Sequence, residues 1–299
     1  MLILMRKALS ILLALVLLLP AVSLAETTLL YNTGDETGSA LAAELASLLD
    51  LPLEEAEENG VAVNVIAADP GKAALVSQLA LIEGLQGYTD EDVRKTLQLV
   101  LPLARSSLYV LCSPETADQF SLEDLSSLSA CLEAQPFALT LMRSFDAGPL
   151  DMAALDLFEA LDLETDTFAD FSDCVENLSA GAYLLIAEEE QAAALSNSGS
   201  VRVLGPLTAE RTARFPELPA AGETGLPVCQ GLVWGVYQSV DADPAPLLSV
   251  LSALPENAKF LDTLSRLGLY AVDPSEFVLA DKLKQYVDYM TEEGLFFYD

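Results

Sequence analysis

The side chains that could do chemistry in this sequence are almost all carboxylates. The chain contains 46 Asp and Glu, 14 Lys and Arg and no histidine, which gives a formal net charge of −32. Without histidine there is no Ser-His-Asp or Cys-His pair for nucleophilic catalysis, and no pair of carboxylates stands out as a glycosidase couple. We therefore expect a protein that is not an enzyme. The acidic balance repels phosphate backbones, so we also expect no nucleic-acid partner.

One loop near the start of the chain could bind a ligand through its backbone. Residues 27–31 predict a strand, residues 32–38 a glycine-containing turn, and residues 39–49 an Ala- and Leu-rich helix. Backbone N–H groups and the helix dipole at such a helix start can meet an anion. The alternative is an ordinary turn between a strand and a helix.

A second candidate is Arg143, one of the few cations in the chain. It follows a predicted strand at 137–142, and ligands of open α/β sheets bind at the carboxyl ends of strands. Its guanidinium could hold a carboxylate through two hydrogen bonds. The alternative is a salt bridge to Asp146 or Asp151.

Strands that alternate with helices must position both candidates. Residues 61–66 predict a second strand, and Asp69 with Pro70 the cap and first residue of the next helix. Thr89 is expected to cap a further helix that runs to about Val100. Such alternation indicates parallel strand pairing in an α/β fold.

A proline-rich segment in the last third of the chain predicts an ordered loop. Residues 215–227 contain three prolines, which exclude a helix or an inner strand. The β-branched and aromatic residues of 232–237 predict a buried strand directly after it. A loop of this length inside a compact domain usually covers a surface or serves a site.

This loop and strand resemble those of the solute-binding proteins of tripartite tricarboxylate transporters, the Bug family. The residues that fit the family pattern in order and nearly in spacing are Arg211, Pro216, Glu217, Pro219, Glu223, Gly225, Leu226, Pro227 and Trp234. The resemblance extends over the whole chain after the first 25 residues. It is strongest in residues 201–290 and weakest where ligand contacts are expected. There Asp35 and Glu36 replace glycines of the family.

The resemblance implies an α/β fold of the two-lobe, type-2 periplasmic binding protein kind, each lobe a mainly parallel sheet flanked by helices. Lobe 1 would comprise residues 26–105 plus 206–299, and lobe 2 residues 106–205. The ligand would lie between the lobes, where the matching residues are Tyr31, Thr33, Gly34, Thr37, Arg143, Ser144 and Gly148.

The function that the resemblance implies is capture of a small carboxylated solute for a membrane transporter of the tripartite tricarboxylate type. Such a protein acts as a monomer and needs no metal or other cofactor. The alternative is a secreted binding-like protein that has lost or changed its ligand and serves as an interaction or sensory module. The acidic residues Asp35 and Glu36 motivate this alternative, and a cleft filled by Phe145 or Phe171 would support it.

The first 25 residues predict a secretory signal peptide. Arg6 and Lys7 precede an apolar stretch at 8–19, and Ser23-Leu24-Ala25 forms a small-x-small cleavage site. We therefore expect an exported protein, periplasmic or at the cell surface. The alternative is an uncleaved signal that acts as a membrane tether.

Disulfide bonds are allowed in such an oxidising compartment. The four cysteines, Cys112, Cys131, Cys174 and Cys229, permit three full pairings, among which sequence does not choose. The alternative is that most are buried free thiols. Their spacing matches no zinc site, and no histidine completes one.

Overall fold

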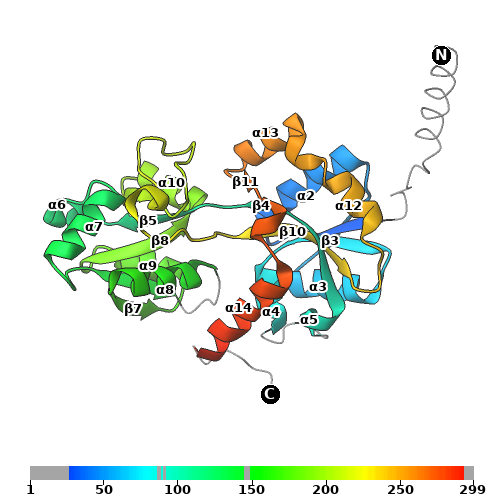
Figure 1. Cartoon of the computed structure of the whole chain (residues 1–299), viewed down its shortest axis with the longest axis horizontal. Coiled ribbons are helices and arrows are strands. Elements are labelled where there is room, and N and C mark those ends of the chain that lie inside the picture. The colour runs from blue at the N-terminus through cyan, green and yellow to red at the C-terminus, as the bar shows by residue number, and fades with distance from the viewer. Residues whose placement is uncertain (1–26, 86–88, 90–91, 145–148, 293–299) are drawn as a thin grey trace, which may run out of the picture.

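The computed structural model describes residues 27–85, 89, 92–144 and 149–292. The predicted signal peptide at 1–25 and the predicted ligand residue Gly148 lie outside these residues. Two bodies, each built on one sheet, are connected by extended segments, and α14 extends below them toward the second body (Figure 1).

The first sheet has six strands in the order β11-β4-β10-β3-β1-β2. Its strands are β1 (Thr28–Asn32), β2 (Leu53–Ala56), β3 (Lys72–Ser77), β4 (Leu97–Arg105), β10 (Val233–Ser239) and β11 (Tyr270–Ala271). β1 pairs in parallel with β2 and β3, whereas β10 runs antiparallel to β3 and β4. The segments around this sheet are α2 (Glu36–Leu49), α3 (Asn59–Ala68), α4 (Leu79–Leu85), α5 (Val93–Thr96), α12 (Ala245–Leu251), η2 (Leu254–Glu256), α13 (Ala258–Arg266), η3 (Pro274–Glu276) and α14 (Leu279–Glu292).

The second sheet has five strands in the order β7-β6-β8-β5-β9. Its strands are β5 (Leu108–Cys112), β6 (Thr140–Ser144), β7 (Glu164–Phe168), β8 (Tyr183–Glu188) and β9 (Arg202–Pro206). β6 is parallel to β7 and β8, and β5 is antiparallel to β8 and β9. The helices of this half are α6 (Pro114–Phe120), α7 (Leu125–Ala134), α8 (Pro149–Leu161), α9 (Phe171–Asn177), α10 (Glu189–Asn197) and α11 (Ala221–Thr224).

The two-lobe α/β fold expected from the sequence is confirmed, but the strand pairing is mixed in each sheet rather than mainly parallel. The chain leaves the first sheet along β4 and returns along β10, so these neighbouring strands run in opposite directions. Each sheet is covered on both faces. Adjacent residues Leu29 and Leu30 of β1, for example, belong to different hydrophobic clusters because successive side chains of a strand point to opposite faces.

The strand expected at 61–66 is wrong, since this stretch lies within helix α3. The buried residues of α3 include Asn59, Ala62, Val63 and Ile66, which share one face of a helix because they are three or four residues apart. The helix expected to begin at Pro70 is wrong as well, because β3 follows instead. Packing of this face against the first sheet outweighs the strand preference of its valines and isoleucine.

The helix expected from Thr89 to about Val100 is wrong apart from one turn, and its cap is Asp92 rather than Thr89. α5 is a single turn capped by the Asp92 side chain, and β4 begins at Leu97. β4 runs between β10 and β11, and it leads directly into the second sheet. A pattern of leucines with one valine fits a buried strand as well as a helix, and strand pairing decides between them.

The loop predicted at 215–227 contains one helical turn, α11, which ends at Gly225 with a φ of 77°. Leu207, Leu226 and Cys229 belong to the same core cluster as Leu108 and Leu204 of the second sheet. By packing, this segment is part of the second lobe. We therefore propose that the second lobe comprises residues 106 to about 230, rather than ending at 205.

We expect Gly205→Ala to lower the free energy of unfolding by about 2 kcal/mol. Gly205 has a φ of 152°, and an added Cβ would lie 2.5 Å from the carbonyl oxygen of Pro219. Gly199→Ala is the matched control, because Gly199 has a φ of 76° but open space around it; it should cost about 1 kcal/mol. Urea unfolding measures both, and equal losses would contradict a tight contact between β9 and the proline-rich loop.

All four cysteines are buried free thiols in the structure. Burial raises the pKa of the Cys112 thiol and of the Cys229 thiol to about 12 in each case. These thiols are therefore protonated and poorly reactive at neutral pH. As for the membrane, none of the helices in the described part of the chain is long and apolar enough to cross a bilayer.

Candidate functional site between the two lobes

The start of α2 is already occupied by a carboxylate of the protein. Asp35 Oδ1 accepts a hydrogen bond from the backbone N–H of Gly38 at 2.8 Å, which caps the helix. Its Oδ2 accepts a hydrogen bond from the indole Nε1 of Trp234 at 2.7 Å. Asp35 thus takes the position at the helix N-terminus where an anionic ligand could otherwise bind.

The four predicted ligand residues of this loop make local contacts. Tyr31 donates a hydrogen bond to Glu55 Oε1 at 3.0 Å, and Thr33 Oγ1 donates to the Ala56 carbonyl at 3.3 Å. Gly34 donates its N–H to Asn32; it also lines a cavity of about 420 Å³ that contains Glu57, Glu58 and Glu83. Thr37 lies in the first turn of α2 and is partly exposed.

Arg143 forms the salt bridge that the sequence left open as the alternative. Its Nε donates to Oδ1 of Asp151 at 2.7 Å and its Nη2 donates to Oδ2 at 2.8 Å. Tyr289 of α14 donates a hydrogen bond to the same Oδ2. Since Tyr289 packs in a core cluster of the first sheet, this group of three side chains also connects the two lobes.

The partly buried Ser144 follows Arg143 at the end of β6. Together with Phe171, these two residues line a cavity of only about 10 Å³, which has no room for a solute. This cavity is lined by residues of the second lobe alone, and the cavity beside Gly34 by residues of the first lobe alone. Neither cavity therefore brings the predicted ligand residues at 31–37 together with those at 143–148. Gly148 itself lies outside the described residues.

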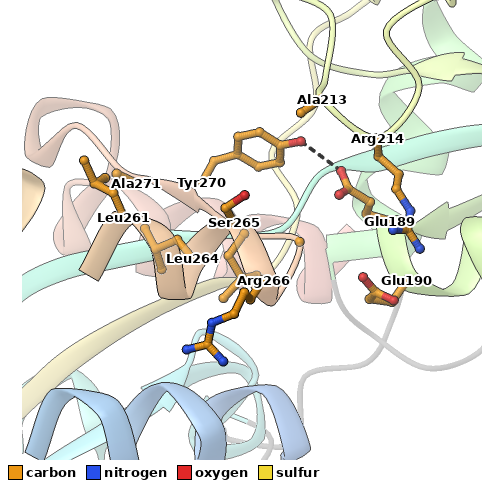
Figure 2. A pocket seen from close by; sticks show the side chains of 12 residues that line it. Glu189, Glu190, Ala213, Arg214, Leu261, Leu264, Ser265, Arg266, Tyr270 and Ala271 are labelled. Carbon is orange, nitrogen blue, oxygen red and sulfur yellow. Dashed lines mark hydrogen bonds between the residues drawn. The ribbon is translucent and has the colours of Figure 1, made fainter. Parts of the chain in front are cut away.

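A third cavity, of about 400 Å³, lies between the lobes at α10, α13 and β11. Its polar side chains are those of Glu189, Glu190, Arg214, Ser265, Arg266 and Tyr270. Figure 2 shows Arg214 beside Glu189, while Ser265 and Arg266 project from the facing helix. Sequence reasoning missed this arrangement, because its members are separated by up to about eighty residues and no motif connects them.

A hydrogen-bond network joins the two lobes at the edge of this cavity. Glu189 Oε2 accepts a hydrogen bond from Tyr109 at 2.7 Å. It accepts a second one from Tyr270 at 3.0 Å (Figure 2). Tyr109 belongs to the second sheet and Tyr270 to the first. Burial raises the pKa of Glu189, and the two phenols oppose this shift by hydrogen bonding to its carboxylate.

Glu188 lies where the chain crosses between the lobes. Its Oε1 accepts a hydrogen bond from Ser106 Oγ at 3.0 Å, and Ser106 Oγ in turn accepts one from the Leu232 N–H at 3.0 Å. Ser106 and Leu232 lie on the two different crossing segments. Burial, together with the charge of Asp35, raises the pKa of Glu188 to about 7. A carboxylate at the crossing therefore titrates near neutral pH.

The cations without an ion pair are found between the lobes. Within the described residues, Arg105, Arg214 and Lys282 form no salt bridge, whereas the other lysines and arginines there do. Arg105 ends β4 at the crossing, and Arg214 and Lys282 each line an interlobe cavity. Although neither Arg214 nor Lys282 forms an ion pair there, the charge of Arg214 opposes the rise that burial causes in the pKa of Glu189, and the charge of Lys282 does the same for the pKa of Asp156.

The motif residues of the proline-rich loop have structural partners. Arg211 Nε donates to Glu223 Oε1 at 2.9 Å, and its Nη1 donates to the Glu217 carbonyl at 3.2 Å. These bonds close the loop on itself. As for metals, no group of three or more carboxylates or cysteines in the described ranges is arranged to hold one.

Two α/β lobes joined by two crossing segments, with polar cavities between them, define the fold of a type-2 periplasmic binding protein. No protein-family model matches the chain, and no curated protein matches it by sequence. Solved structures do match. MatC from Rhodopseudomonas palustris with bound malate is 18% identical, with a TM-score of 0.57 over 88% of this chain and 97% of that chain.

Two further solved structures have the same fold. A TctC solute-binding protein from Polaromonas, without ligand, is 16% identical, with a TM-score of 0.66 over 89% of this chain and 98% of that chain. Rpa4515 from R. palustris with adipate is 15% identical, with a TM-score of 0.59 over 89% of this chain and 95% of that chain. The resemblance to the TctC and Bug solute-binding proteins is therefore confirmed at the level of the fold.

Proposed function

We propose that this protein is an exported solute-binding protein, not an enzyme, that captures a small carboxylated solute between its two lobes. It acts as a monomer and delivers the solute to a secondary transporter of the tripartite tricarboxylate type. The observation that carries the proposal is the interlobe cavity of about 400 Å³ lined by Arg214, an arginine without an ion pair in the described part of the chain. The malate and adipate in two structures of the same fold support this class of ligand.

The charges in this cavity favour a carboxylate beside Arg214. The carboxylate of Glu189 accepts hydrogen bonds from the hydroxyl groups of Tyr109 and Tyr270, which stabilise its negative charge. The guanidinium of Arg214 can hold a carboxylate with two parallel hydrogen bonds, and Ser265 lines the facing wall as a further donor. Glu190, which also lines the cavity, would repel a second carboxylate. We therefore expect a preference for solutes with one carboxylate and a polar or cationic group over tricarboxylates.

The proposal is tested by the melting temperature of residues 26–299 with a panel of mono-, di- and tricarboxylates, amino acids and neutral amides. A ligand at 100 times its dissociation constant adds about 2.7 kcal/mol to the free energy of unfolding, which is a shift of about 5–10 °C. Arg214→Ala should weaken binding about tenfold to a hundredfold, because a hydrogen bond to a charged group is worth about 1.5–3 kcal/mol.

Arg202→Ala is the matched control for this experiment. Arg202 lies on the outer part of the second lobe, in an exposed ion pair with Asp118, and its removal should leave binding unchanged. A shift that survives Arg214→Ala would place the solute elsewhere. The ligand contacts expected from the sequence at 31–37 and 143–148 stay a prediction and would then be the first alternative.

A second function, that of an interaction module without a solute, is favoured by one specific observation. The positions that correspond to the family's ligand loops hold Asp35 at the start of α2 and an Arg143 that is bound to Asp151. Phe171 also lines the cavity of about 10 Å³ beside Arg143. If folded protein shown to be free of ligand gives no shift across the whole panel, this second function is the better account.

A further inference from the structure

A second polar cavity between the lobes has a lining that fits a different kind of molecule. It has a volume of about 160 Å³ and lies where α8 of the second lobe meets α14 and the start of α4 of the first. Its polar lining includes Gln78, Asp156 and Lys282. It shares no lining residue with the cavity beside Arg214, so the two can be tested separately.

Gln78 contributes a buried carbonyl oxygen that has no partner. The residue is only 3% exposed; its backbone N–H donates to Val233 O at 2.8 Å, and its Nε2 donates to Gly231 O. No donor in the described residues reaches its Oε1. Because an unsatisfied buried oxygen costs free energy, a donor from a bound molecule would be favourable here.

Asp156 and Lys282 contribute one charge of each sign, from helices of different lobes. Both line the cavity, yet no salt bridge among the described residues joins them; Lys282 Nζ instead donates to Gln285 Oε1 at 3.3 Å. Burial raises the pKa of Asp156 and lowers the pKa of Lys282. The charge of each group opposes the shift in the pKa of the other. The wall of the cavity thus presents a carboxylate and an amino group that are not joined by an ion pair.

We propose that this cavity binds a small zwitterion of the size of alanine or serine. The ammonium group would face Asp156 and the free Oε1 of Gln78, and the carboxylate would face Lys282. The volume agrees with this size, since a cavity of about 150 Å³ holds benzene, a molecule of six heavy atoms, as many as alanine has. Because its walls come from both lobes, an occupied cavity would stabilise the observed arrangement of the lobes.

The test is isothermal titration of the full mature chain with glycine, L-alanine and L-serine, and with propionate and isopropylamine as analogues that each lack one charge. Zwitterions should bind at least tenfold more tightly than either analogue. Lys282→Gln and Asp156→Asn should each weaken zwitterion binding at least tenfold. Lys284→Gln is the matched control on the same helix, since Lys284 is exposed and pairs with Asp288; it should change nothing.

Several outcomes would overturn the proposal. Propionate binding as tightly as alanine would show that the ammonium site is absent, and no heat from any zwitterion at millimolar concentration would show that the cavity is not a site. Binding that Arg214→Ala abolishes and Lys282→Gln leaves intact would assign the amino acid to the other cavity, which is the site of the proposed function. If Lys282→Gln does not fold, Asp156→Asn gives the same decision.

Discussion

Asp151→Ala is expected to lower the free energy of unfolding by about 3–5 kcal/mol, because it removes the carboxylate that binds the Arg143 guanidinium in a poorly solvated place. Asp151 is 4% exposed, and its carboxylate accepts hydrogen bonds from Arg143 and from Tyr289. One substitution therefore removes an ion pair within the second lobe and a bond between the lobes. Urea unfolding followed by circular dichroism measures the loss.

The control for this prediction is Asp118→Ala. Asp118 pairs with Arg202, but its side chain is 76% exposed, and exposed pairs contribute about 0–1 kcal/mol. The double variant Arg143→Met/Asp151→Leu should recover much of the loss, since well-packed apolar residues can replace a buried pair. If Asp151→Ala costs no more than Asp118→Ala, Arg143 is not held for structural reasons, and its predicted role in ligand binding would become the better explanation.

Glu188→Gln is expected to stabilise the protein by about 3 kcal/mol above pH 8 and to have almost no effect below pH 4.5. The pKa of Glu188 is raised from its ordinary value of 4.5 to about 7. The folded protein therefore holds the proton more tightly than the unfolded chain. Its contribution to stability is fully present below about pH 4.5 and is lost as the pH rises through about 7. Glutamine keeps the oxygen that accepts the Ser106 hydrogen bond and carries no charge.

The measurement is the difference in unfolding free energy between wild type and Glu188→Gln from pH 4 to pH 8.5. Taking this difference cancels the titration of the many other carboxylates. Glu190→Gln, two residues further along in the first turn of α10, is the control, because Glu190 is exposed, and its effect should be small beside that of Glu188→Gln. A flat difference for Glu188→Gln would contradict a desolvated carboxylate at the crossing.

Both predictions concern carboxylates that the acidic composition alone does not distinguish. Most of the 46 acidic residues need no explanation beyond solubility. Asp35, Asp151 and Glu188 differ because each has specific donors: a helix N-terminus with an indole, a guanidinium with a phenol, and a serine hydroxyl. They lie at the start of α2, at the contact between the lobes and at the crossing.

The fold was largely predictable because it depends on local signals and on one ordered motif. The strands predicted at 27–31 and 232–237 are short β-branched or leucine-rich runs with turn residues beside them, and the structure contains both, at 28–32 and 233–239. Resemblance of the proline-rich loop then selected the two-lobe class among α/β folds. The wrong predictions at 61–66 and 97–100 have one cause. A short apolar run is compatible with both the helix period and the strand period, and the element that it packs against decides which structure forms.

The candidate site was predictable only in part. The sequence by itself determined the fold class, the exclusion of histidine chemistry and the scarcity of cations, because these depend on composition and on patterns within a few residues. The tertiary structure decided which cations are free. Arg143 is bound by Asp151, eight residues away, whereas Arg214 forms no ion pair with a described residue, lies beside Glu189, and lines a cavity whose facing wall is made by residues 265–271, far along the chain. A charge is available to a ligand only if no nearer partner neutralises it, and distances between distant segments exist only after folding.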